Sequence, residues 1–314
     1  MQSFPRIGIV IVHLNAYDDT SVCLRSLEAM TYPNASIIVV DNGSTDGSGE
    51  RLRQEFPGLI HLHSGENLGC TGGNNIGIEY AITSGCDHVL MLNNDTVITP
   101  GFVEPLVERM LSDETIGAVS GKIYYYPPAV SGRDKIIWYA GSFQKWHTGF
   151  HHIGESEEDH GQFDLAMRTE YASGSLMLMR GEVIRMIGGL SNEYFIYWEE
   201  SDWCLHAREL GYSSWYEPRS AIYHNFKSAV AGKESPFYMY MQTRNSFIFA
   251  RRRFHGLLFI RHFFLYPFYI GYRWLVVKRA GNTVAAKAVI RGIIDYFRGY
   301  RGKKGLREYG YIRS

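Results

Sequence analysis

The first hundred residues alternate between short apolar runs and amphipathic stretches. Four apolar runs have the length and composition of buried β-strands, and they lie at residues 7–14, 36–40, 59–63 and 89–92. Three amphipathic stretches between them are predicted to be helices, at about residues 19–30, 48–56 and 72–84. Strands that alternate with helices in this way predict an α/β fold built on a parallel sheet.

Polar residues follow three of these strands directly. The clusters occupy residues 15–18, 41–46 and 93–96. Ligands of open α/β sheets bind at the carboxyl ends of the strands. Ordinary turn residues would explain any one cluster, but three clusters at corresponding positions favour a binding site at this edge of the sheet.

The pattern is less regular after residue 123 and becomes regular again from Tyr171. Here the sequence predicts a strand at residues 174–179, followed by helices at 180–187 and 200–210. Gly211 follows the last of these helices, as glycine commonly does at a helix C-terminus.

The composition is that of a folded globular protein, because 45% of the residues are hydrophobic and 20% are charged. A chain of 314 residues can bury a substantial core, either as one large domain or as two. The four cysteines include no C-x-x-C pair, and the first residues lack the basic start and the cleavage site of a signal peptide. We therefore expect a protein of the reducing cytoplasm.

The charge is balanced overall but unevenly distributed. The chain has 32 basic and 32 acidic residues, yet residues 251–314 contain fifteen Lys or Arg and two acidic residues. The chain thus has a basic C-terminal end and an acidic remainder.

The basic end also carries many aromatic and aliphatic residues. Arg261, His262 and Arg273 interrupt its apolar stretch at 254–277, which leaves it short of the roughly 20 residues that a spanning helix needs. One helical face beyond it is apolar and consists of Ala286, Val289, Ile290, Ile293, Phe297 and Tyr300. This layout favours a helix at an anionic membrane surface, ahead of packing on the main domain. No nucleic-acid-binding module accompanies the charge, so nucleic acid is not an expected partner.

Two groups of polar residues, each with at least one carboxylate, carry the candidate chemistry. Asn93-Asn94-Asp95 follows a buried strand and offers the hard oxygen ligands that Mg²⁺ or Mn²⁺ prefers. One Asp needs a partner, and His224 could supply it, although His224 taken alone is better explained as an ordinary core or surface histidine. The stretch 197–202 places three carboxylates at the start of a helix, where its dipole favours acids. Desolvation by Trp198 would raise the pKa of such a carboxylate, as a general base requires.

The stretch 67–75 is rich in glycine and asparagine and precedes a helix, so its amides could approach a phosphate or a sugar. It matches neither a P-loop nor a G-x-G-x-x-G fingerprint. An enzyme that uses a nicotinamide cofactor or ATP is therefore disfavoured.

Taken in order, these motifs strongly resemble family 2 glycosyltransferases, above all the bacterial rhamnosyltransferase-like branch. The motifs are residues 9–15, 39–47, 67–75, 92–95 and 198–202. The resemblance covers roughly residues 7–250. It implies a GT-A fold, in which a nucleotide-binding α/β half and an acceptor half share one central mixed sheet. It also implies transfer of a sugar from a nucleoside diphosphate to a hydroxyl, with inversion at the anomeric carbon.

The resemblance assigns roles to individual positions. Donor contacts fall on Asn15, Asp41, Asn67, Asn74, Asn93, Asn94 and Asp95. Asp95 and His224 occupy the positions of the metal ligands, which implies Mg²⁺ or Mn²⁺ as cofactor. Glu200 is aligned with the catalytic base, and Glu199 and Asp202 are the alternatives.

The same resemblance suggests substrates and a domain division. The donor would be dTDP-rhamnose or a UDP-sugar, and the acceptor a glycan or a polyprenyl-diphosphate-linked oligosaccharide of the cell surface. We expect a catalytic domain at 1–250, with halves at 1–123 and 124–250, and a helical tail at 251–314. The protein would lie peripherally on the inner face of the plasma membrane.

Three other functions are compatible with parts of this pattern. A processive polysaccharide synthase would carry a Gln-x-x-Arg-Trp motif, but Gln242-Thr243-Arg244-Asn245 stands at the corresponding place. A catalytically silent nucleotide-sugar-binding or scaffold protein could use the same fold. A nucleotidyltransferase would release diphosphate rather than a nucleoside diphosphate.

Overall fold

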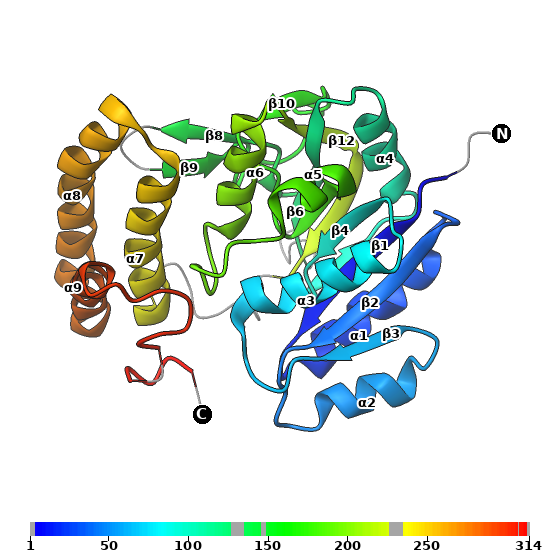
Figure 1. The fold of residues 1–314 in the computed structure, drawn as a ribbon, viewed down its shortest axis with the longest axis horizontal. Helices are drawn as coiled ribbons and strands as arrows, with labels where there is room; N and C mark the ends of the chain where they lie inside the picture. The colour runs from blue at the N-terminus through cyan, green and yellow to red at the C-terminus, as the bar shows by residue number, and fades with distance from the viewer. Residues whose placement is uncertain (1–3, 127–134, 146–148, 226–234, 307, 313–314) are drawn as a thin grey trace.

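An α/β body and a layer of three long helices stand side by side in the protein (Figure 1). The computed structural model describes residues 4–126, 135–145, 149–225, 235–306 and 308–312. The N-terminal half of the chain lies at one end of the molecule and the three helices lie at the other end.

A mixed sheet forms the centre of the α/β body. In spatial order its strands are β10 (Met167–Thr169), β12 (Ser213–His224), β6 (Ile116–Tyr125), β11 (Leu176–Arg180), β4 (His88–Leu92), β1 (Ile7–His13), β2 (Ala35–Asp41) and β3 (Ile60–His63). The strands β4, β1, β2 and β3 are parallel, whereas β11 runs antiparallel to both β4 and β6. Four short strands complete the described α/β body, namely β5 (Thr96–Ile98) beside β12, β7 (Ile137–Tyr139) beside β6, and the pair of β8 (Ser142–Lys145) and β9 (Gly149–His152).

Helices cover both faces of this sheet. The helices of the α/β body are α1 (Tyr17–Ser26), α2 (Ser48–Glu55), α3 (Gly69–Thr83), α4 (Val103–Leu111), α5 (Gly181–Ile187) and α6 (Glu199–Glu209), and a short 3₁₀ turn (Leu27–Ala29) follows α1. Leu24, Leu52 and Leu106 pack α1, α2 and α4 on one face. Ile78 of α3 and Trp203 of α6 belong to the core on the other face.

The first four predicted strands and the helices between them are present. The strand predicted at 7–14 is β1, and the strand predicted at 89–92 is β4. Helix α3 begins at Gly69, earlier than the predicted residue 72. Gly69 adopts a φ of 75°, a conformation that favours glycine. A Cβ atom on Gly69 would lie 2.3 Å from the carbonyl oxygen of Phe195, so only glycine fits this close approach.

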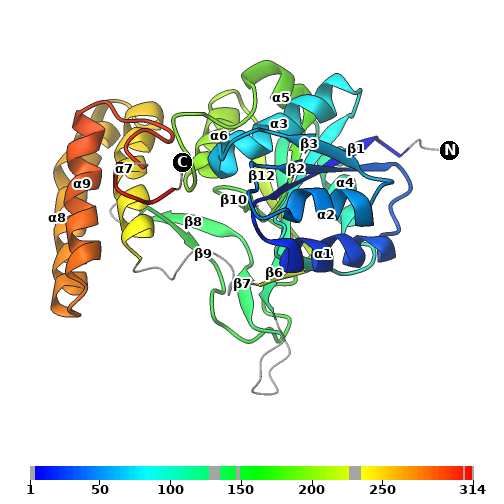
Figure 2. The same ribbon diagram turned by 90° about the horizontal axis from the view of Figure 1, so that it is seen from below.

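The C-terminal region is helical, as predicted, but its helices pack as one layer. They are α7 (Pro236–Arg253), α8 (Gly256–Arg279) and α9 (Thr283–Phe297), and α8 lies outermost (Figure 2). The boundary predicted at residue 250 falls inside α7. In the described part of the chain, no helix is long and apolar enough to cross a membrane.

Helix α9 packs against α7 along part of the face that the sequence assigned to a membrane. Ala286 and Val289 are buried, whereas Ile290 and Phe297 remain 44% and 64% exposed. The predicted apolar face is therefore divided between internal packing and solvent, because α7 presents its own apolar residues to α9.

Candidate active site

Asn15 and Asp41 lie at the carboxyl ends of the neighbouring parallel strands β1 and β2. Asn15 follows β1 with a φ of 49°, and its side-chain oxygen accepts a hydrogen bond from the amide of Thr45 at 2.9 Å. Asp41 ends β2, and its carboxylate accepts from the amide of Ser44 at 2.9 Å and lies 3.2 Å from a ring nitrogen of His63. The predicted donor residues Asn15 and Asp41 are thus neighbours at the sheet edge where ligands bind.

Asn42 and Asn67 shape the start of α3. The buried Asn42 donates to the carbonyl of Gly69 at 3.0 Å and accepts from the amide of Leu68 at 3.1 Å. Asn67 accepts from the amide of Gly69 at 2.9 Å. Asn42 fixes the glycine-rich start of α3 against β2, a role that the sequence pattern did not reveal because Asn42 looked like an ordinary turn residue.

A chain of polar side chains connects the ends of β4 and β1 to α1 and α2. Asn94 donates to the Thr20 hydroxyl at 2.8 Å, and Thr20 lies 2.8 Å from one ring nitrogen of His13. The other ring nitrogen of His13 lies 2.8 Å from the Ser48 hydroxyl. Burial lowers the pKa of His13, which favours its neutral form. Sequence reasoning missed this network because its members are far apart in the chain.

Asp95 and His224 meet at the edge of the sheet. The Oδ1 atom of Asp95 lies 2.7 Å from Nε2 of His224, and the side chains are 11% and 3% exposed. Strand β5 pairs His224 with Thr96, which brings this distant histidine beside Asp95. Asn93 lies within reach as well, because its Nδ2 is 3.4 Å from Nε2 of His224.

The Asp95–His224 pair is compatible with a divalent cation. Neighbouring ligands of an octahedral Mg²⁺ at 2.0–2.1 Å are about 3 Å apart, close to the separation of these two atoms. The described residues contain no group of three or more His, Cys, Asp or Glu placed to hold a metal. Two protein ligands suit a site at which substrate phosphates supply further oxygens.

The second carboxylate cluster stands at the start of α6. Glu199 is 5% exposed, and burial raises the pKa of both Glu199 and Glu200. The nearby Glu200 raises the pKa of Glu199 further. Among the described residues, none donates a hydrogen bond to the Oε2 atom of either carboxyl group. A desolvated carboxylate with a free acceptor atom suits proton abstraction from a hydroxyl.

The backbone before these glutamates is strained. Tyr197 and Trp198 have φ values of 70° and 79°, which are costly for large side chains. Asn245 of α7 donates to the carbonyls of Ile196 and Tyr197 at 2.9 and 3.0 Å. Gln242, one turn earlier, accepts from the indole of Trp198 at 2.7 Å. Helix α7 therefore holds the turn that places Glu199 and Glu200.

Asn74 does not point freely into the site. It donates to the carbonyl of Cys70 at 2.9 Å and contacts the Cys70 sulfur at 3.3 Å. Burial and the nearby charges of Glu199 and Glu200 raise the pKa of the Cys70 thiol. The start of α3 thus adjoins the glutamate pair, and Asn74 supports it from within the helix.

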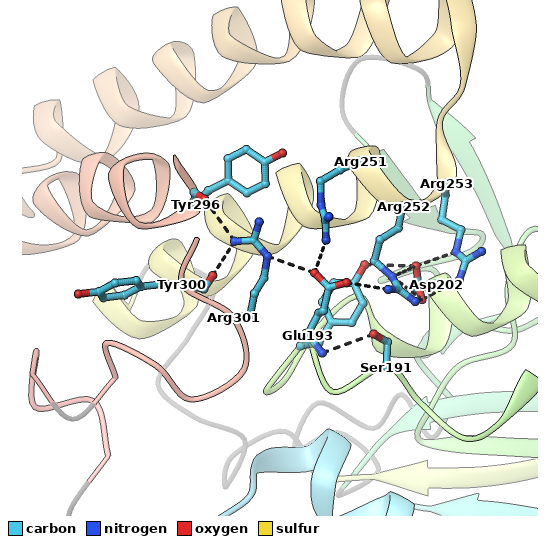
Figure 3. Close-up of polar contacts among 10 residues, drawn as sticks. Ser191, Glu193, Asp202, Arg251, Arg252, Arg253, Tyr296, Tyr300 and Arg301 are labelled. Carbon is cyan, nitrogen blue, oxygen red and sulfur yellow. Dashed lines mark hydrogen bonds and ion pairs between the residues drawn. The ribbon is translucent and has the colours of Figure 1, made fainter. Parts of the chain in front are cut away.

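Asp202 lies in an ion-pair cluster (Figure 3). Arg253 donates to Asp202 Oδ1 at 2.7 Å, and Arg252 donates to the same atom at 3.1 Å. Arg252 also pairs with Glu193 at 2.8 Å, and Arg301 reaches Glu193 at 3.1 Å. Both oxygens of Asp202 are occupied by guanidinium groups, so Asp202 is a weaker candidate for the base than Glu199 or Glu200.

The short segment 174–175 lies near both groups of candidate residues. Asn93 donates from its side chain to Ser175 at 3.1 Å, and its amide reaches the Ser175 carbonyl at 3.2 Å. A Cβ atom on the preceding Gly174 would lie 3.7 Å from the Cβ and Cγ atoms of Glu200. The segment 174–175 therefore links the surroundings of Asp95 and His224 to Glu200.

Comparison with known proteins supports a glycosyltransferase. A family model described as glycosyl transferase family 2 matches residues 8–185. An N-acetylglucosaminyl-diphospho-decaprenol L-rhamnosyltransferase of Mycobacterium tuberculosis is 26% identical, over 74% of this chain and 80% of that protein. A dTDP-rhamnosyl transferase, RfbF of Shigella flexneri, is 25% identical over 72% of this chain and 74% of that protein.

Solved structures identify the fold as GT-A. The mannosyltransferase PcManGT of Pyrobaculum calidifontis, in complex with GDP-Man and Mn²⁺, aligns with a TM-score of 0.57 at 16% identity, over 91% of this chain and 74% of that one. GalNAc-T7 with UDP, GalNAc and Mn²⁺ aligns with a TM-score of 0.61 at 17% identity. That alignment covers 78% of this chain and 48% of the neighbour.

Proposed function

Because this chain belongs to glycosyl transferase family 2, we propose that it transfers a sugar from a nucleoside-diphosphate sugar to an acceptor hydroxyl, with inversion at the anomeric carbon. One observation carries the proposal. Asn93 contacts both His224 and Ser175, and the adjacent Gly174 lies beside Glu200, which supports a common site for the Asp95–His224 and Glu199–Glu200 pairs. One group of residues can thus hold the donor diphosphate while the other removes the acceptor proton.

The donor is held by the ends of the parallel strands. Asp41 and Asn15 contact the base or the ribose, and the start of α3 with Asn67 approaches the sugar phosphates. Asn93 and Asn94 complete this edge, and Asn94 is fixed by its bond to Thr20. Asn74 acts as a support of α3.

Asp95 and His224 would hold Mg²⁺ or Mn²⁺ beside the donor diphosphate. When bound, the ion stabilises the negative charge of the departing nucleoside diphosphate. The two structural neighbours were solved with Mn²⁺, which supports a divalent ion as the cofactor.

Glu200 accepts the proton of the incoming hydroxyl. Burial raises its pKa, so the carboxylate is a stronger base than an exposed glutamate. Attack from the face opposite the leaving diphosphate gives inversion in one displacement. Glu199 carries the matching carboxyl group and is the alternative base.

The substrates follow from the relatives. Two of them are named as rhamnosyltransferases, one acting on a diphospho-decaprenol acceptor. We therefore expect dTDP-rhamnose, or else a UDP-hexose, as donor. A glycan or a polyprenyl-diphosphate-linked oligosaccharide of the cell envelope would be the acceptor, which places the reaction at the cytoplasmic face of a membrane.

The test is nucleotide release from a panel of nucleotide sugars by the purified full-length chain. Release of a nucleoside diphosphate, lost in EDTA and restored by Mg²⁺ or Mn²⁺, is expected. Glu200→Gln should lower turnover by about 10²- to 10⁴-fold with little change in donor affinity. Unchanged turnover in Glu200→Gln would move the base elsewhere, and unchanged turnover in EDTA would refute the metal.

A silent nucleotide-sugar-binding protein is the second candidate. It would bind the donor, shown by a raised melting temperature, without releasing any nucleotide. Release of diphosphate instead of a nucleoside diphosphate would identify a nucleotidyltransferase.

A further inference from the structure

Among the residues whose side chains the structure describes, α8 exposes large apolar side chains along one sector of the helix. Six residues at helical spacing form this outer stripe, namely Leu257, Ile260, Phe264, Phe268, Tyr272 and Leu275, with exposures between 37% and 77%. Figure 2 shows α8 at the outer edge of the molecule. A surface helix normally turns its polar face outwards, and a contiguous apolar patch marks an interaction site.

A groove runs between α8 and α9 beside this stripe. Its volume is about 340 Å³. The lining is apolar and includes Phe247, Pro267, Gly271, Trp274, Ile290 and Phe297. No heavy atom lies within 4 Å of the position that a Cβ on Gly271 would take, so the groove is open there.

Basic residues stand at one end of the groove. A second cavity, of about 480 Å³, shares Trp274 and Ile290 with the first and is also lined by Lys278, Lys287 and Arg291, mainly through the apolar stems of these side chains. Within the described part of the chain, none of these three cations forms an ion pair with a carboxylate. The ammonium group of Lys278 lies 4.5 Å from the Trp274 ring.

We propose that the groove between α8 and α9 binds an acyl chain of an anionic membrane phospholipid, with its phosphate against Lys278, Lys287 and Arg291. The outer stripe of α8 then lies in the same leaflet. The ligand should have an apolar chain, because both adjoining cavities have apolar walls. It should also have an anionic head, because three cationic side chains extend from the wall of the second cavity. This lipid site rests on the proposed function only for the expectation that the protein works at a membrane.

A second copy of the chain would explain the outer stripe less well. Such a copy could cover the apolar residues, but residues 251–314 contain fifteen basic and two acidic residues and would offer few anions to the cations. A lipid leaflet supplies the apolar surface and the anions together.

Flotation with vesicles tests the outer stripe. The full-length protein should float with vesicles of phosphatidylcholine and phosphatidylglycerol, and the double variant Phe264→Ser, Phe268→Ser should remain in the soluble fraction. The matched control is Leu165→Ser, which changes a residue that is 84% exposed in another part of the molecule. Flotation of the double variant at the wild-type level would overturn the assignment of the stripe.

Quenching of tryptophan fluorescence by lipids brominated in the acyl chain tests the groove. A Cβ on Gly271 meets no atom within 4 Å, so Gly271→Leu should extend into the groove and fill it. It should abolish the part of the quenching that is due to Trp274, which Trp274→Phe identifies. Gly58→Leu is the control, because a Cβ there also meets no atom within 4 Å. Wild-type quenching in Gly271→Leu would refute a chain in the groove.

The head-group contact has its own variant. Lys278→Gln with Lys287→Gln should weaken binding to phosphatidylglycerol vesicles by roughly 20- to 30-fold, since each cation near an anionic leaflet contributes about 1 kcal/mol. Equal binding of the wild type to pure phosphatidylcholine would overturn the anionic head group. A dimer in sedimentation that Phe264→Ser, Phe268→Ser abolishes, without vesicle binding by the wild type, would assign the stripe to a second copy. All these assays omit sugar donor and acceptor, so their failure leaves the proposed reaction standing.

Discussion

Glu199 and Glu200 are both desolvated at the start of α6, and this burial has a measurable effect on the pH dependence of the reaction. The Glu199 pKa is raised by burial and then by the charge of Glu200, so the two carboxyl groups titrate as a pair. If Glu200 is the base, the acid limb of the pH profile of kcat/KM should lie above the ordinary glutamate value of 4.5. Glu199→Gln should leave that limb nearly in place, because burial, and not the charge of Glu199, raises the Glu200 pKa. A steady-state pH profile of both proteins compares the two limbs.

The same pair also makes stability depend on pH. Their native pKa values are raised, so the charged forms are disfavoured in the folded state, and their contribution to the free energy of unfolding is full below pH 4.5 and declines as pH rises through the raised values. Glu199→Gln should flatten this decline in urea unfolding measured across pH. Loss of all turnover in Glu199→Gln, with an unchanged Glu200→Gln enzyme, would instead make Glu199 the base.

Asn245 is the residue we expect to position this pair. Asn245→Ala removes both donors that hold the strained turn and should lower kcat by about 10²-fold, with an unchanged KM for the donor. Ser246→Ala is the matched control, because Ser246 is equally buried on α7 but bonds to Thr243 within the helix and to Tyr266 of α8, and not to the strained turn. A similar loss of stability in both variants with full kcat in Asn245→Ala would reduce Asn245 to a structural role.

At the scale of elements, α6 and α7 are joined by charge as well as by hydrogen bonds. Asp202 is 2% exposed and faces Arg252 and Arg253. Asp202→Asn would remove the buried anion that faces both guanidinium groups, leaving Arg252 with Glu193 and Arg253 with Glu209, and should cost about 3–5 kcal/mol in urea unfolding. Glu209→Gln, at a 40% exposed partner of Arg253, should cost less than about 1 kcal/mol. Turnover per folded molecule should survive in Asp202→Asn, and a fall of about 10²-fold or more would return Asp202 to the candidates for the base.

The sequence predicted the elements whose pattern is local. Strands β1 to β4 are buried apolar runs, and the polar residues after β1, β2 and β4 were expected at one edge. The short strands β5, β7, β8, β9 and β10 were missed, because three or four residues carry too little periodicity to be distinguished from a loop. Strand β12 contains Glu217 and Arg219, whose charges are paired within the fold, and so it did not resemble a buried strand.

The site was predicted in the same uneven way. Asp95, His224 and Glu200 stood in recognisable motifs, although only the pairing of β5 with β12 shows how His224 reaches Asp95. The supports could not be foreseen, because His13, Thr20 and Asn245 act through partners remote in the chain. Gln242 and Asn245 stood out only as a failed match to a synthase motif, yet both hold the turn before Glu199.

At the scale of the whole molecule, the three C-terminal helices are both a support of the active site and the outer surface of the protein. Helix α7 holds the strained turn on one side and packs against α9 on another. Arg244 of α7 donates to the carbonyls of Gly302 and Lys304 at 2.8 and 3.3 Å and to the side chain of Asn245 at 3.2 Å. The chain beyond residue 253 is therefore connected to the glutamate pair through Arg244 and Asn245.

This connection predicts the result of truncation. A chain that ends at residue 253 would expose the apolar side of α7 and leave the buried Arg244 and Tyr240 without Gly302 and Asp295 as partners. We expect a lower melting temperature or aggregation, and loss of transfer even to a soluble acceptor that needs no membrane. The control is the double variant Phe264→Ser, Phe268→Ser, which we expect not to bind vesicles. It should still transfer sugar to the soluble acceptor at the full rate. A truncated chain that melts at the wild-type temperature and transfers sugar at the wild-type rate would show that α8 and α9 serve only as an attachment to the membrane.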